Sequence, residues 1–578
     1  MVNLKINNIP VSVEEGSTIL DAARVAHIHI PHLCYLKDLN EIGACRICSV
    51  EVTGESKLIP ACESKVYEGM EVFTDTARVR SAIRTNLSFI LAQHKSECTY
   101  CVRSGNCQLQ ALAEDYNIKN DRFVPDLPPE SMLKWNKNFP LIRDASKCIK
   151  CLRCIQVCEK VQGLGVWDLV STGSRTNVDV KNQQKIEDSD CVMCGQCITH
   201  CPVGALYARD NVRDVARALE NPDVITVFQF APAIRNTWFE DFGIGKDVAT
   251  EKRLVGILKK MGANYVFDTS FAADLTIMEE ANEFLERFTE KKLGKYPMFT
   301  SCCPGWVKML QDQFPELVDN LSSAKSPQEM FGAIIKTYFA EKNNIDPSKI
   351  KVVSIMPCVA KKYEADLKSL SSRGYQNVDI VLTTRELVRL IKSFRIHPHR
   401  VDEADYDSLM AEYSGAAVIF GTTGGVMEAA LRTAYCKLMG KNPPLDLLDN
   451  AKWINHKGGT WREASFDLNG TKVTIAVASG LKNAMTLCRA ILRGDYKYDF
   501  VEVMACPGGC SGGGGQPIHM DDIERADMRG KLLHDIDKSY TLRYSHENKD
   551  VQKLYDDYLK HPLSELSEEL LHKDQHAR

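Results

Sequence analysis

The sequence lacks the features of several large classes of protein. It has no long run of lysine or arginine, and 72 basic against 76 acidic residues give a formal net charge of −4. A general nucleic-acid-binding protein would carry a basic surface. No apolar stretch reaches the about 18 residues of a spanning helix, and Met1–Pro10 alternates like a strand, unlike a signal peptide. We therefore expect a cytoplasmic protein with no nucleic-acid or membrane partner.

Nucleotide-binding motifs are absent as well. Two segments, Gly421–Gly425 and Gly508–Gly515, are rich in glycine, but neither matches the P-loop pattern or the dinucleotide fingerprint. Glycine permits a close approach of the backbone and a positive φ, which a bulky inorganic cluster needs. We expect no flavin, NAD or nucleotide site, and we associate these glycines with a metal cluster.

Cysteine, in contrast, is abundant and unevenly placed. Of the 22 cysteines in 578 residues, 15 lie in residues 1–201 and 7 in the remaining 377. In a reducing cytosol, clustered thiols act as metal ligands more often than as disulfides. The length suggests roughly four domains at about 150 residues each. The first third of the chain is therefore expected to concentrate metal centres.

The first cysteine group has the pattern C-x10-C-x2-C-x13-C and comprises Cys34, Cys45, Cys48 and Cys62. It follows two alternating segments and an N-capped helix that we predict over Gly16–Arg24. This order suits a small β-grasp, ferredoxin-like domain with a [2Fe–2S] cluster. A structural zinc site of four thiolates is the alternative.

The second group is His94-x3-Cys98-x2-Cys101-x5-Cys107, which follows a helical pattern at Val79–Ala92. Three thiolates and one imidazole suit either zinc or an iron–sulfur cluster. A lone histidine is more often an ordinary surface residue, so only the neighbouring cysteines make His94 a candidate ligand. The spacing by itself leaves the metal open.

The third and fourth groups repeat the run C-x2-C-x2-C-x3-C at an interval of 43 residues. In two-cluster ferredoxins the fourth cysteine of each run binds the other cluster. We therefore assign Cys148, Cys151, Cys154 and Cys201 to one [4Fe–4S] cluster, and Cys191, Cys194, Cys197 and Cys158 to its partner. Beside two such clusters, the His94 group is best interpreted as a third [4Fe–4S] cluster, since zinc would not conduct electrons. Its imidazole should raise the potential, as in Rieske centres.

From about Asn211 the pattern changes to alternating strands and helices. Short β-branched runs predict strands, at Val224–Phe230, Lys351–Met356, Ala416–Phe420, Lys472–Val477 and Phe500–Met504. Such runs, separated by helical patterns, indicate α/β layers with parallel strands.

The seven late cysteines fall into two kinds. Five lie in a turn or just after a predicted strand: Cys302, Cys303, Cys358, Cys506 and Cys510. Strand ends at a topological switch point are where α/β folds bind cofactors. Cys436 and Cys488 lie in helical patterns with no partner nearby in sequence, so we interpret them as packing residues.

Three motifs in this region carry a family resemblance. The segments TSCCPGW at 300–306, MPCVAKKYE at 356–364 and EVMACPGGCSGGGGQP at 502–517 resemble, in order, the three motifs of [FeFe]-hydrogenases. The four early cysteine groups are similar to the accessory-cluster domains of the large monomeric clostridial type. The resemblance covers essentially the whole chain.

The resemblance implies a multidomain fold of α+β and α/β parts. We expect a β-grasp [2Fe–2S] domain at 1–80 and a small helical His/Cys3 [4Fe–4S] domain at 81–125. A ferredoxin-like domain with two [4Fe–4S] clusters follows at 126–210. The catalytic domain, at 211–578, is expected to be two-lobed with parallel sheets.

The resemblance also implies a catalytic H-cluster, a [4Fe–4S] cube on Cys303, Cys358, Cys506 and Cys510, with Cys510 bridging to a di-iron subsite. In the family that subsite carries CO, cyanide and a bridging dithiolate, and its surroundings must hold it by packing and hydrogen bonds. Lys361 would hydrogen-bond a cyanide. Met356 and Met504 would pack beside the irons, and the pocket would be lined by Ala231, Pro232, Ser326, Gln328 and Phe420.

A proton relay is implied by the same resemblance: Cys302 as the terminal carrier, and behind it Glu280, Ser322 and Glu283. Apolar spacing predicts a helix over Thr276–Phe288, with the two glutamates three residues apart on one face. Carboxylates on a helix face are usually just solvated. Burial would raise the carboxyl pKa, which suits proton transfer.

The function implied is that of a ferredoxin hydrogenase, which reversibly reduces protons to H2 with electrons from ferredoxin or flavodoxin. One [2Fe–2S] and three accessory [4Fe–4S] clusters would carry the electrons, and maturation proteins would insert the di-iron subsite. A hydrogen sensor of the same fold is one alternative, although it typically lacks the cysteine at position 302. A non-catalytic iron–sulfur electron-transfer or assembly protein is the other.

Overall fold

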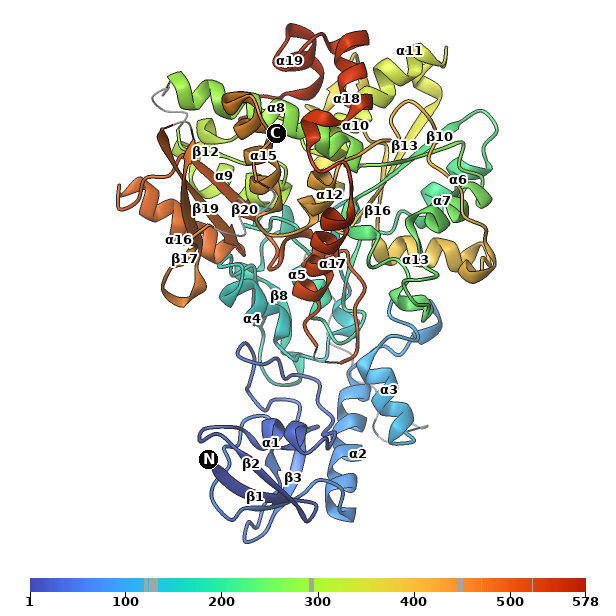
Figure 1. Ribbon diagram of the computed structural model, residues 1–578. Coiled ribbons are helices and arrows are strands. Elements are labelled where there is room, and N and C mark those ends of the chain that lie inside the picture. The colour runs from blue at the N-terminus through green and yellow to red at the C-terminus, as the bar shows by residue number, and fades with distance from the viewer. Residues whose placement is uncertain are drawn as a thin grey trace.

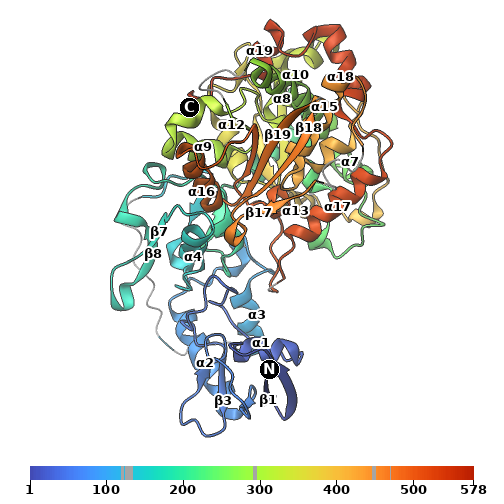
Figure 2. The ribbon, with the colours of Figure 1, turned by 60° about the vertical axis from the view of Figure 1, so that its left-hand side comes forward.

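The computed structural model describes residues 1–118, 123, 134–290, 296–444, 451–468, 470–521 and 523–577. The N-terminal part forms a smaller body beneath a larger one built from the rest of the chain (Figure 1 and Figure 2). Within these described ranges, no helix is both long and apolar enough to cross a bilayer. The predicted domain boundary between residues 125 and 126 lies outside the described residues.

The N-terminal body is a mixed five-stranded sheet of order β2-β1-β5-β3-β4, and the helix Ile19–Val25 packs on it. β1 and β2 form a hairpin, and β1 pairs in parallel with β5. The predicted N-capped helix is confirmed, because Thr18 and Asp21 form a capping box at the start of α1. The elements are β1 (Val2–Ile6), β2 (Ile9–Val13), α1 (Ile19–Val25), β3 (Ser49–Val52), β4 (Ile59–Pro60) and β5 (Glu71–Phe73).

Short elements connect this body to the larger one. The predicted helix at 79–92 is confirmed as α2 (Ala77–Ala92), and α3 (Gln108–Asp115) follows it. β6 pairs antiparallel with β9, which joins Leu141 to Ala208 and so brings the two four-cysteine runs side by side. The remaining elements are β6 (Leu141–Arg143), α4 (Arg153–Lys160), β7 (Trp167–Val170), β8 (Asn177–Val180), α5 (Gln196–Thr199) and β9 (Leu206–Ala208).

The first sheet of the larger body has the order β11-β10-β13-β16 and is wholly parallel, as predicted. Its strands are buried on both faces under helices, as parallel strands require. The strands are β10 (Ile225–Phe230), β11 (Tyr265–Asp268), β13 (Ile350–Met356) and β16 (Ile380–Thr383). The helices here are α6 (Val212–Glu220), α7 (Glu251–Lys260), α8 (Ser270–Glu290), α10 (Pro327–Ile334), α11 (Ala340–Lys342), α12 (Ala360–Asp366) and α13 (Thr384–Ser393).

The second sheet, of order β12-β20-β19-β18-β17, corrects the expectation of parallel sheets, because only its first three strands are parallel. Leu468 pairs with Thr471 across the β18–β19 hairpin, and two intervening residues are too few for a parallel crossover. The strands are β12 (Met298–Phe299), β17 (Ile454–Asn455), β18 (Arg462–Leu468), β19 (Thr471–Ser479) and β20 (Phe500–Met504).

The predicted strand at Ala416–Phe420 is wrong. These residues form the buried helix α14 (Gly415–Val418), which continues as a 3₁₀ turn. The Ser414 hydroxyl accepts the backbone N–H of Ala417 and caps the helix. A short apolar run reads the same in a buried helix and a buried strand, so the pattern could not decide.

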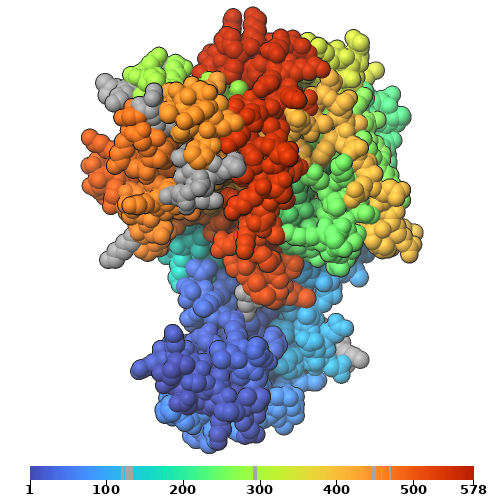
Figure 3. Space-filling view, viewed as in Figure 1, coloured from blue at the N-terminus to red at the C-terminus, as the bar shows by residue number. Residues whose placement is uncertain are grey.

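The remaining helices are α9 (Pro304–Gln313), α15 (Gly425–Met439), α16 (Leu481–Leu492), α17 (Ala526–Ser539), α18 (Lys549–Leu554) and α19 (Glu565–Leu571). Cys436 lies in α15 and Cys488 in α16, as predicted. In the space-filling view the C-terminal segment, in red, runs between the orange lobe of the second sheet and the green and yellow lobe of the first (Figure 3).

Candidate catalytic pocket and cluster sites

A cavity of about 80 Å³ lies where strands of both sheets end. β10 leads into it at Ala231, β13 at Met356 and β20 at Met504. Predicted site residues on its wall are Ala231, Pro232, Cys302, Cys303, Gln328, Met356, Cys358, Lys361, Phe420, Met504, Cys506 and Cys510. Residues far apart in the sequence thus meet at one largely apolar cavity.

The four predicted ligands of the catalytic cluster all face this cavity. Cys303 precedes α9, Cys358 follows β13, and Cys506 and Cys510 follow β20. Burial, followed by the neighbouring thiols, raises the pKa of Cys510 to about 12. Four converging cysteines in an apolar cavity are the donor set of a four-thiolate iron–sulfur cluster, so the residues present fit that cofactor.

Glycine is required beside this cavity by the packing of two chain segments. Gly509 has a φ of +74°, and a Cβ there would lie 2.8 Å from the carbonyl carbon of Thr422. At Gly513 a Cβ would lie 2.2 Å from the carbonyl oxygen of Pro357. The close neighbours are backbone atoms, so Gly509 allows the loop after β20 to approach the segment 421–423, and Gly513 allows it to approach the loop after β13.

Lys361 reaches the cavity from α12 with a fixed ammonium group. Its Nζ donates to Glu364 Oε2 at 2.7 Å and to the Cys302 carbonyl at 3.1 Å. Burial disfavours the charge, but attraction to the Glu364 carboxylate outweighs it and raises the pKa of Lys361. The predicted lining residue Ser326 is not on the cavity wall; its hydroxyl donates to Glu364 at 2.8 Å.

Glu364 is a residue that the sequence analysis missed. It lies in the MPCVAKKYE segment, three residues after Lys361 on α12, which is the spacing of an ion pair on one helix face. It also accepts from Gln328 Nε2 at 3.2 Å. This one carboxylate therefore holds Lys361, Ser326 and Gln328 in place.

The predicted proton carriers Cys302 and Glu280 come close enough to interact. Burial, then the Glu280 carboxylate, raises the pKa of the Cys302 thiol. Burial also raises the pKa of Glu280 to about 8, with further contributions from Glu283 and Glu502. Within the described part of the chain, Glu280 Oε2 has no hydrogen-bond partner. Both groups are therefore protonated at neutral pH.

Glu283 and Ser322 are directly hydrogen-bonded. The Ser322 hydroxyl donates to Glu283 Oε2 at 2.6 Å, and Ser323 donates to the same carboxylate from its backbone N–H at 3.0 Å. Arg287, one turn further along α8, pairs with Glu283 and donates to the Leu321 carbonyl at 2.9 Å. The sequence analysis missed Arg287, although its spacing of four residues from Glu283 is the usual signal of a helical ion pair.

The two four-cysteine runs exchange their fourth members. Cys148, Cys151, Cys154 and Cys201 line a separate cavity of about 20 Å³. Cys158 lies near Cys191, Cys194 and Cys197, because after burial its charge is among the causes that raise the thiol pKa of each. The structure thus brings together the two sets that the spacing predicts.

The second of these sets lies next to the catalytic cavity. The Cys506 thiol is 3.9 Å from the Cys194 carbonyl oxygen, and Gln196 Nε2 donates to the Gly512 carbonyl at 2.8 Å. A cluster on Cys194 and its partners would therefore be the immediate neighbour of one on Cys506.

The first cysteine group is collected in the N-terminal body. The Cys48 thiol donates to the Cys62 sulfur at 3.3 Å, and Cys34 shares hydrogen bonds with Cys45 and Cys62. The buried amide of Asn40 connects this group to the next, because its Nδ2 donates to the Cys34 carbonyl at 2.6 Å and to the Cys151 carbonyl at 2.9 Å.

The predicted ligand His94 is held by a hydrogen bond of its ring. Its Nδ1 lies 2.9 Å from the Lys147 carbonyl oxygen, which fixes the proton on Nδ1 and directs Nε2 elsewhere. Burial lowers the pKa of His94, so the ring is neutral, as a metal ligand must be. Cys98 is exposed, whereas Cys101 and Cys107 are half-buried.

Five family models match successive parts of the chain. They are described as "2Fe-2S iron-sulfur cluster binding domain" at 1–77, "NADH-ubiquinone oxidoreductase-G iron-sulfur binding region" at 84–122 and "4Fe-4S dicluster domain" at 140–215. "Iron only hydrogenase large subunit, C-terminal domain" matches 224–514, and "Iron hydrogenase small subunit" matches 523–578.

Similar proteins extend over the full length. NADP-reducing hydrogenase subunit HndD of Solidesulfovibrio fructosivorans is 43% identical over 99% of this chain and 98% of its own. Iron hydrogenase 1 of Clostridium pasteurianum is 36% identical over 99% of each. Among solved structures, the apo [FeFe]-hydrogenase HydA1 from Chlamydomonas reinhardtii aligns with a TM-score of 0.56 and 38% identity, over 63% of this chain and 98% of that one.

Proposed function

Since this chain belongs to the iron-only hydrogenase family and is an H2-converting enzyme with iron–sulfur relays, we propose that Cys303, Cys358, Cys506 and Cys510 hold its H-cluster. The observation that supports this assignment is the convergence of these four thiols on the cavity that Cys302 and Lys361 also face. When bound, that cofactor supplies the irons at which protons and electrons combine to give H2.

The cavity wall would position and shield the cofactor. Met356, Met504 and Phe420 are buried and apolar, so they exclude water from the reaction site. Lys361 provides a fixed cationic donor for an anionic ligand such as cyanide, and Glu364 keeps the lysine side chain in place. Ala231, Pro232 and Gln328 complete the wall, while Ser326 acts from behind it through Glu364.

Protons would travel along the line Glu283, Ser322, Glu280 and Cys302. The Cys302 thiol holds a proton at the cavity, and the protonated Glu280 carboxyl replaces it. Ser322 and Glu283 supply Glu280 in turn, and Arg287 orients the Glu283 carboxylate at the outer end. General acid catalysis needs pKa values near the operating pH, and the Glu280 value of about 8 satisfies this.

Electrons would pass through four accessory clusters within the proposed units 1–80, 81–125 and 126–210, ahead of the catalytic unit 211–578. These are a [2Fe–2S] cluster on Cys34, Cys45, Cys48 and Cys62, and three [4Fe–4S] clusters. The ligands of the latter are His94, Cys98, Cys101 and Cys107; Cys148, Cys151, Cys154 and Cys201; and Cys158, Cys191, Cys194 and Cys197. The last set leads to Cys506.

Two electron donors are candidates. Ferredoxin or flavodoxin is the first, acting directly on the accessory clusters in the cytoplasm, where reducing conditions keep the cysteines as thiols. The second is a partner subunit that binds NADP(H), and it is favoured by the 43% identity to the NADP-reducing hydrogenase subunit HndD. Separate maturation proteins would insert the di-iron subsite, consistent with a neighbour structure titled for stepwise H-cluster assembly.

Matured holoenzyme, purified anaerobically, distinguishes these donors. H2 evolution is measured with reduced ferredoxin, with reduced flavodoxin and with NADPH. Turnover with either reduced carrier protein supports direct donation. Turnover with NADPH only after extract from the same cells is added supports a partner subunit. Turnover with NADPH by the isolated chain would contradict both, because the sequence offers no nucleotide site.

A further inference from the structure

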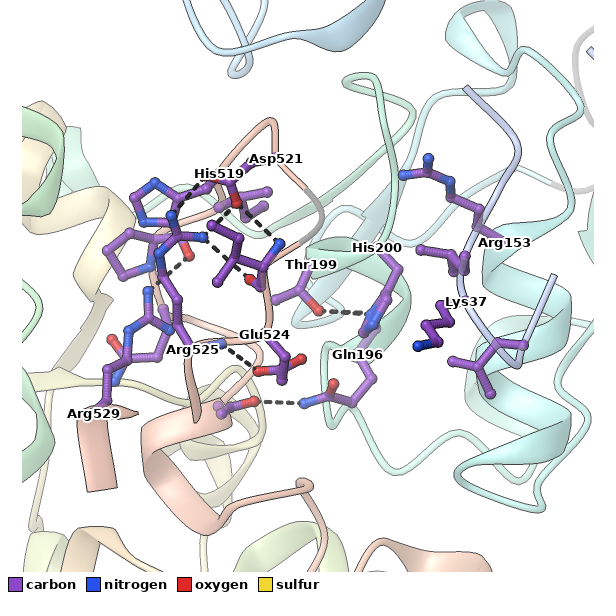
Figure 4. Close-up of a pocket in the computed structure, with 18 of the residues that line it drawn as sticks. Lys37, Arg153, Gln196, Thr199, His200, His519, Asp521, Glu524, Arg525 and Arg529 are labelled. Carbon is purple, nitrogen blue, oxygen red and sulfur yellow. Dashed lines mark hydrogen bonds and ion pairs between the residues drawn. The ribbon is translucent and has the colours of Figure 1, made fainter. Parts of the chain in front are cut away.

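A second cavity, of about 300 Å³, adjoins the catalytic pocket at Gly513, where three parts of the chain meet (Figure 4). One wall is the N-terminal loop with Leu36, Lys37 and Leu39, and another is the start of α4 and the end of α5 with Arg153 and His200. The third is formed by residues within 512–521 and 523–529. The buried Asn40 amide fixes the first wall to the second.

The lining of this cavity is rich in cationic groups. The basic residues of the lining are Arg24, Lys37, Arg153, Arg525 and Arg529, and the acidic residues are Asp521 and Glu524. Arg525 pairs with Asp521 at 2.6 Å, and Arg529 donates to Glu240 at 2.8 Å. Lys37 and Arg153 form no ion pair with any residue that the structure describes. Glu524 accepts hydrogen bonds only from the backbone N–H groups of Arg525 and Ala526, so among the described residues the cavity has two unpaired cations against one unpaired carboxylate.

Arg153 is the group that most requires a partner. Arg153 is only 4% exposed, yet its Nε and Nη2 atoms have no hydrogen-bond partner among the described residues. An unpaired buried charge is costly, and a guanidinium presents a planar pair of donors that matches a carboxylate or phosphate. Figure 4 shows this guanidinium extending from the α4 wall without a dashed line to any neighbour.

Arg153 does not line the adjacent cluster site. Arg153 precedes the predicted ligand Cys154 in the sequence, but it is absent from the lining of the cavity formed by Cys148, Cys151, Cys154 and Cys201. It lines the 300 Å³ cavity instead. Arg153 thus lines a different space from the sulfur ligands; because its Nε and Nη2 are fully buried, an anion in the cavity would contact Nη1.

We propose that this cavity binds a small molecule bearing a phosphate or carboxylate group, which Arg153 holds at the α4 wall and Lys37 neutralises from the N-terminal loop. The volume lies at the lower end of the about 300–1,000 Å³ of small-molecule sites, which suits a compact anion. The site is distinct from the catalytic pocket, and it joins three parts of the molecule.

An anion bound here would influence the neighbouring cluster. Arg153 lies two residues after the proposed cluster ligand Cys151 and directly before Cys154, so its charge is next to the site of that cluster. A bound anion would offset this positive charge and disfavour the extra electron of a reduced cluster, so the anion binds the oxidised protein more tightly. This coupling rests on the proposed ligand set of that cluster, whereas the binding itself does not.

Calorimetric titration of the anaerobic, cluster-loaded full chain tests the binding. Inorganic phosphate and succinate are titrated at constant ionic strength, with chloride as the reference. Saturable binding of either at one site per chain is expected. Arg153→Gln and Lys37→Gln should each weaken it about tenfold or more, because each removes a charged contact. Lys185→Gln, an exposed lysine of the same part of the chain, should leave the affinity unchanged.

Two variants are used so that the misfolding of one would not decide the outcome. Arg153→Gln is adjacent to a predicted ligand, so its iron content is measured in parallel, whereas Lys37→Gln changes an exposed side chain. The binding proposal is overturned if neither anion binds saturably, or if both variants bind as tightly as the unmodified chain. The same titration on protein lacking the di-iron subsite should give the same affinity, so it separates this site from the proposed catalytic one.

Redox titration followed by electron paramagnetic resonance tests the coupling. Saturating anion should lower the midpoint potential of one [4Fe–4S] cluster and leave the others unchanged. A tenfold preference for the oxidised protein corresponds to about 59 mV for one electron. An unchanged set of potentials under conditions where calorimetry shows binding would overturn the coupling.

Discussion

The accessory-cluster region and the catalytic pocket use the same ligand atom but assemble it in opposite ways. In each four-cysteine run, three ligands of a proposed cluster lie within seven residues, and a short antiparallel pair supplies the fourth. The proposed catalytic ligands span residues 303 to 510 and meet only because strands of two sheets end at the same cavity. Local spacing specifies the first kind of site, whereas tertiary structure specifies the second.

The two regions also differ in what accompanies the thiols. The accessory sites are surrounded by backbone groups and packed side chains, as at Cys158, whose sulfur accepts from the Val166 N–H at 3.4 Å. The accessory sites also have buried arginines such as Arg143 beside them, but the catalytic pocket adds buried carboxyl groups, Glu364 beside Lys361 and Glu280 beside Glu283. Electron transfer needs only positioned clusters, but H2 chemistry also needs protons, and this requirement explains the difference.

Cys302→Ala should produce the largest change, because it removes the proton carrier from the catalytic region without removing a ligand. We expect H2 evolution to fall by about 10²–10⁴-fold, with iron content and accessory-cluster spectra preserved. Cys436→Ala, in a half-buried helical position away from the pocket, is the control. Loss of iron in Cys302→Ala would mean that this cysteine is a ligand and that the two kinds of site are not distinguished correctly.

Glu280 gives the catalytic region a pH dependence that the accessory region should not have. Because its pKa is about 8, the carboxyl can donate below that pH and loses its proton above it. H2 evolution should therefore decline as the pH rises through about 8. Glu280→Gln should reduce the rate at every pH and remove this decline with rising pH. Exposed Glu286→Gln on the same helix should behave as the unmodified enzyme.

The same carboxyl makes the stability of the folded chain depend on pH in a defined direction. Its pKa is raised from 4.5 to about 8 in the folded chain, so the folded state binds the proton more tightly. Its contribution to stability is complete below about pH 4.5 and is lost as the pH rises to about 8. The free energies of unfolding of the unmodified protein and of Glu280→Gln, measured with denaturant, should diverge over this pH range. The same pH dependence in both proteins would contradict the assigned pKa.

His94→Ala confines its effect to the accessory region. Only the cluster that includes Cys98, Cys101 and Cys107 should be perturbed, because the other sites take their ligands elsewhere. Iron content should fall by at most one cluster, and only one paramagnetic signal should change. Exposed His29→Ala is the control. Unchanged spectra would return His94 to an ordinary structural role.

Asn40→Ala should produce the smallest effect, at the junction of two accessory sites. It removes hydrogen bonds to Cys34 and Cys151, worth about 1–3 kcal/mol locally. Faster hydrogen exchange is expected around residues 34–40 and 151, with all clusters retained. Asn86→Ala removes a single exposed bond, to Arg46, and should leave exchange there unchanged. Equal exchange in both variants would show that Asn40 does not join the two sites.

The contrast between the regions also explains how far the sequence could predict the structure. The strand Phe500–Met504 and the helix over 79–92 follow from period and length, and β20 and α2 reproduce them closely. The strand predicted at Ala416–Phe420 failed, because a short apolar run is equally compatible with the buried helix found there. The antiparallel β18 was missed because strand direction depends on the connection, not on composition.

The site residues also differ in how well the sequence predicts them. Thiol groups with short spacings were identified from the sequence, and the fold brings together those of the first, third and fourth groups. Polar residues that act through another residue were not, because their role exists only in three dimensions: Glu364 holds Lys361, and Arg287 orients Glu283. Ser326 was expected at the cavity wall but contacts Glu364 from behind it.

Infrared spectroscopy tests the central claim, that the catalytic cavity holds an H-cluster, most directly. Protein co-expressed with the maturation proteins and purified anaerobically should show bands of metal-bound CO and cyanide. The same chain made without those proteins should lack the bands and evolve no H2, while it retains its accessory iron. An active preparation with no such bands would contradict the account.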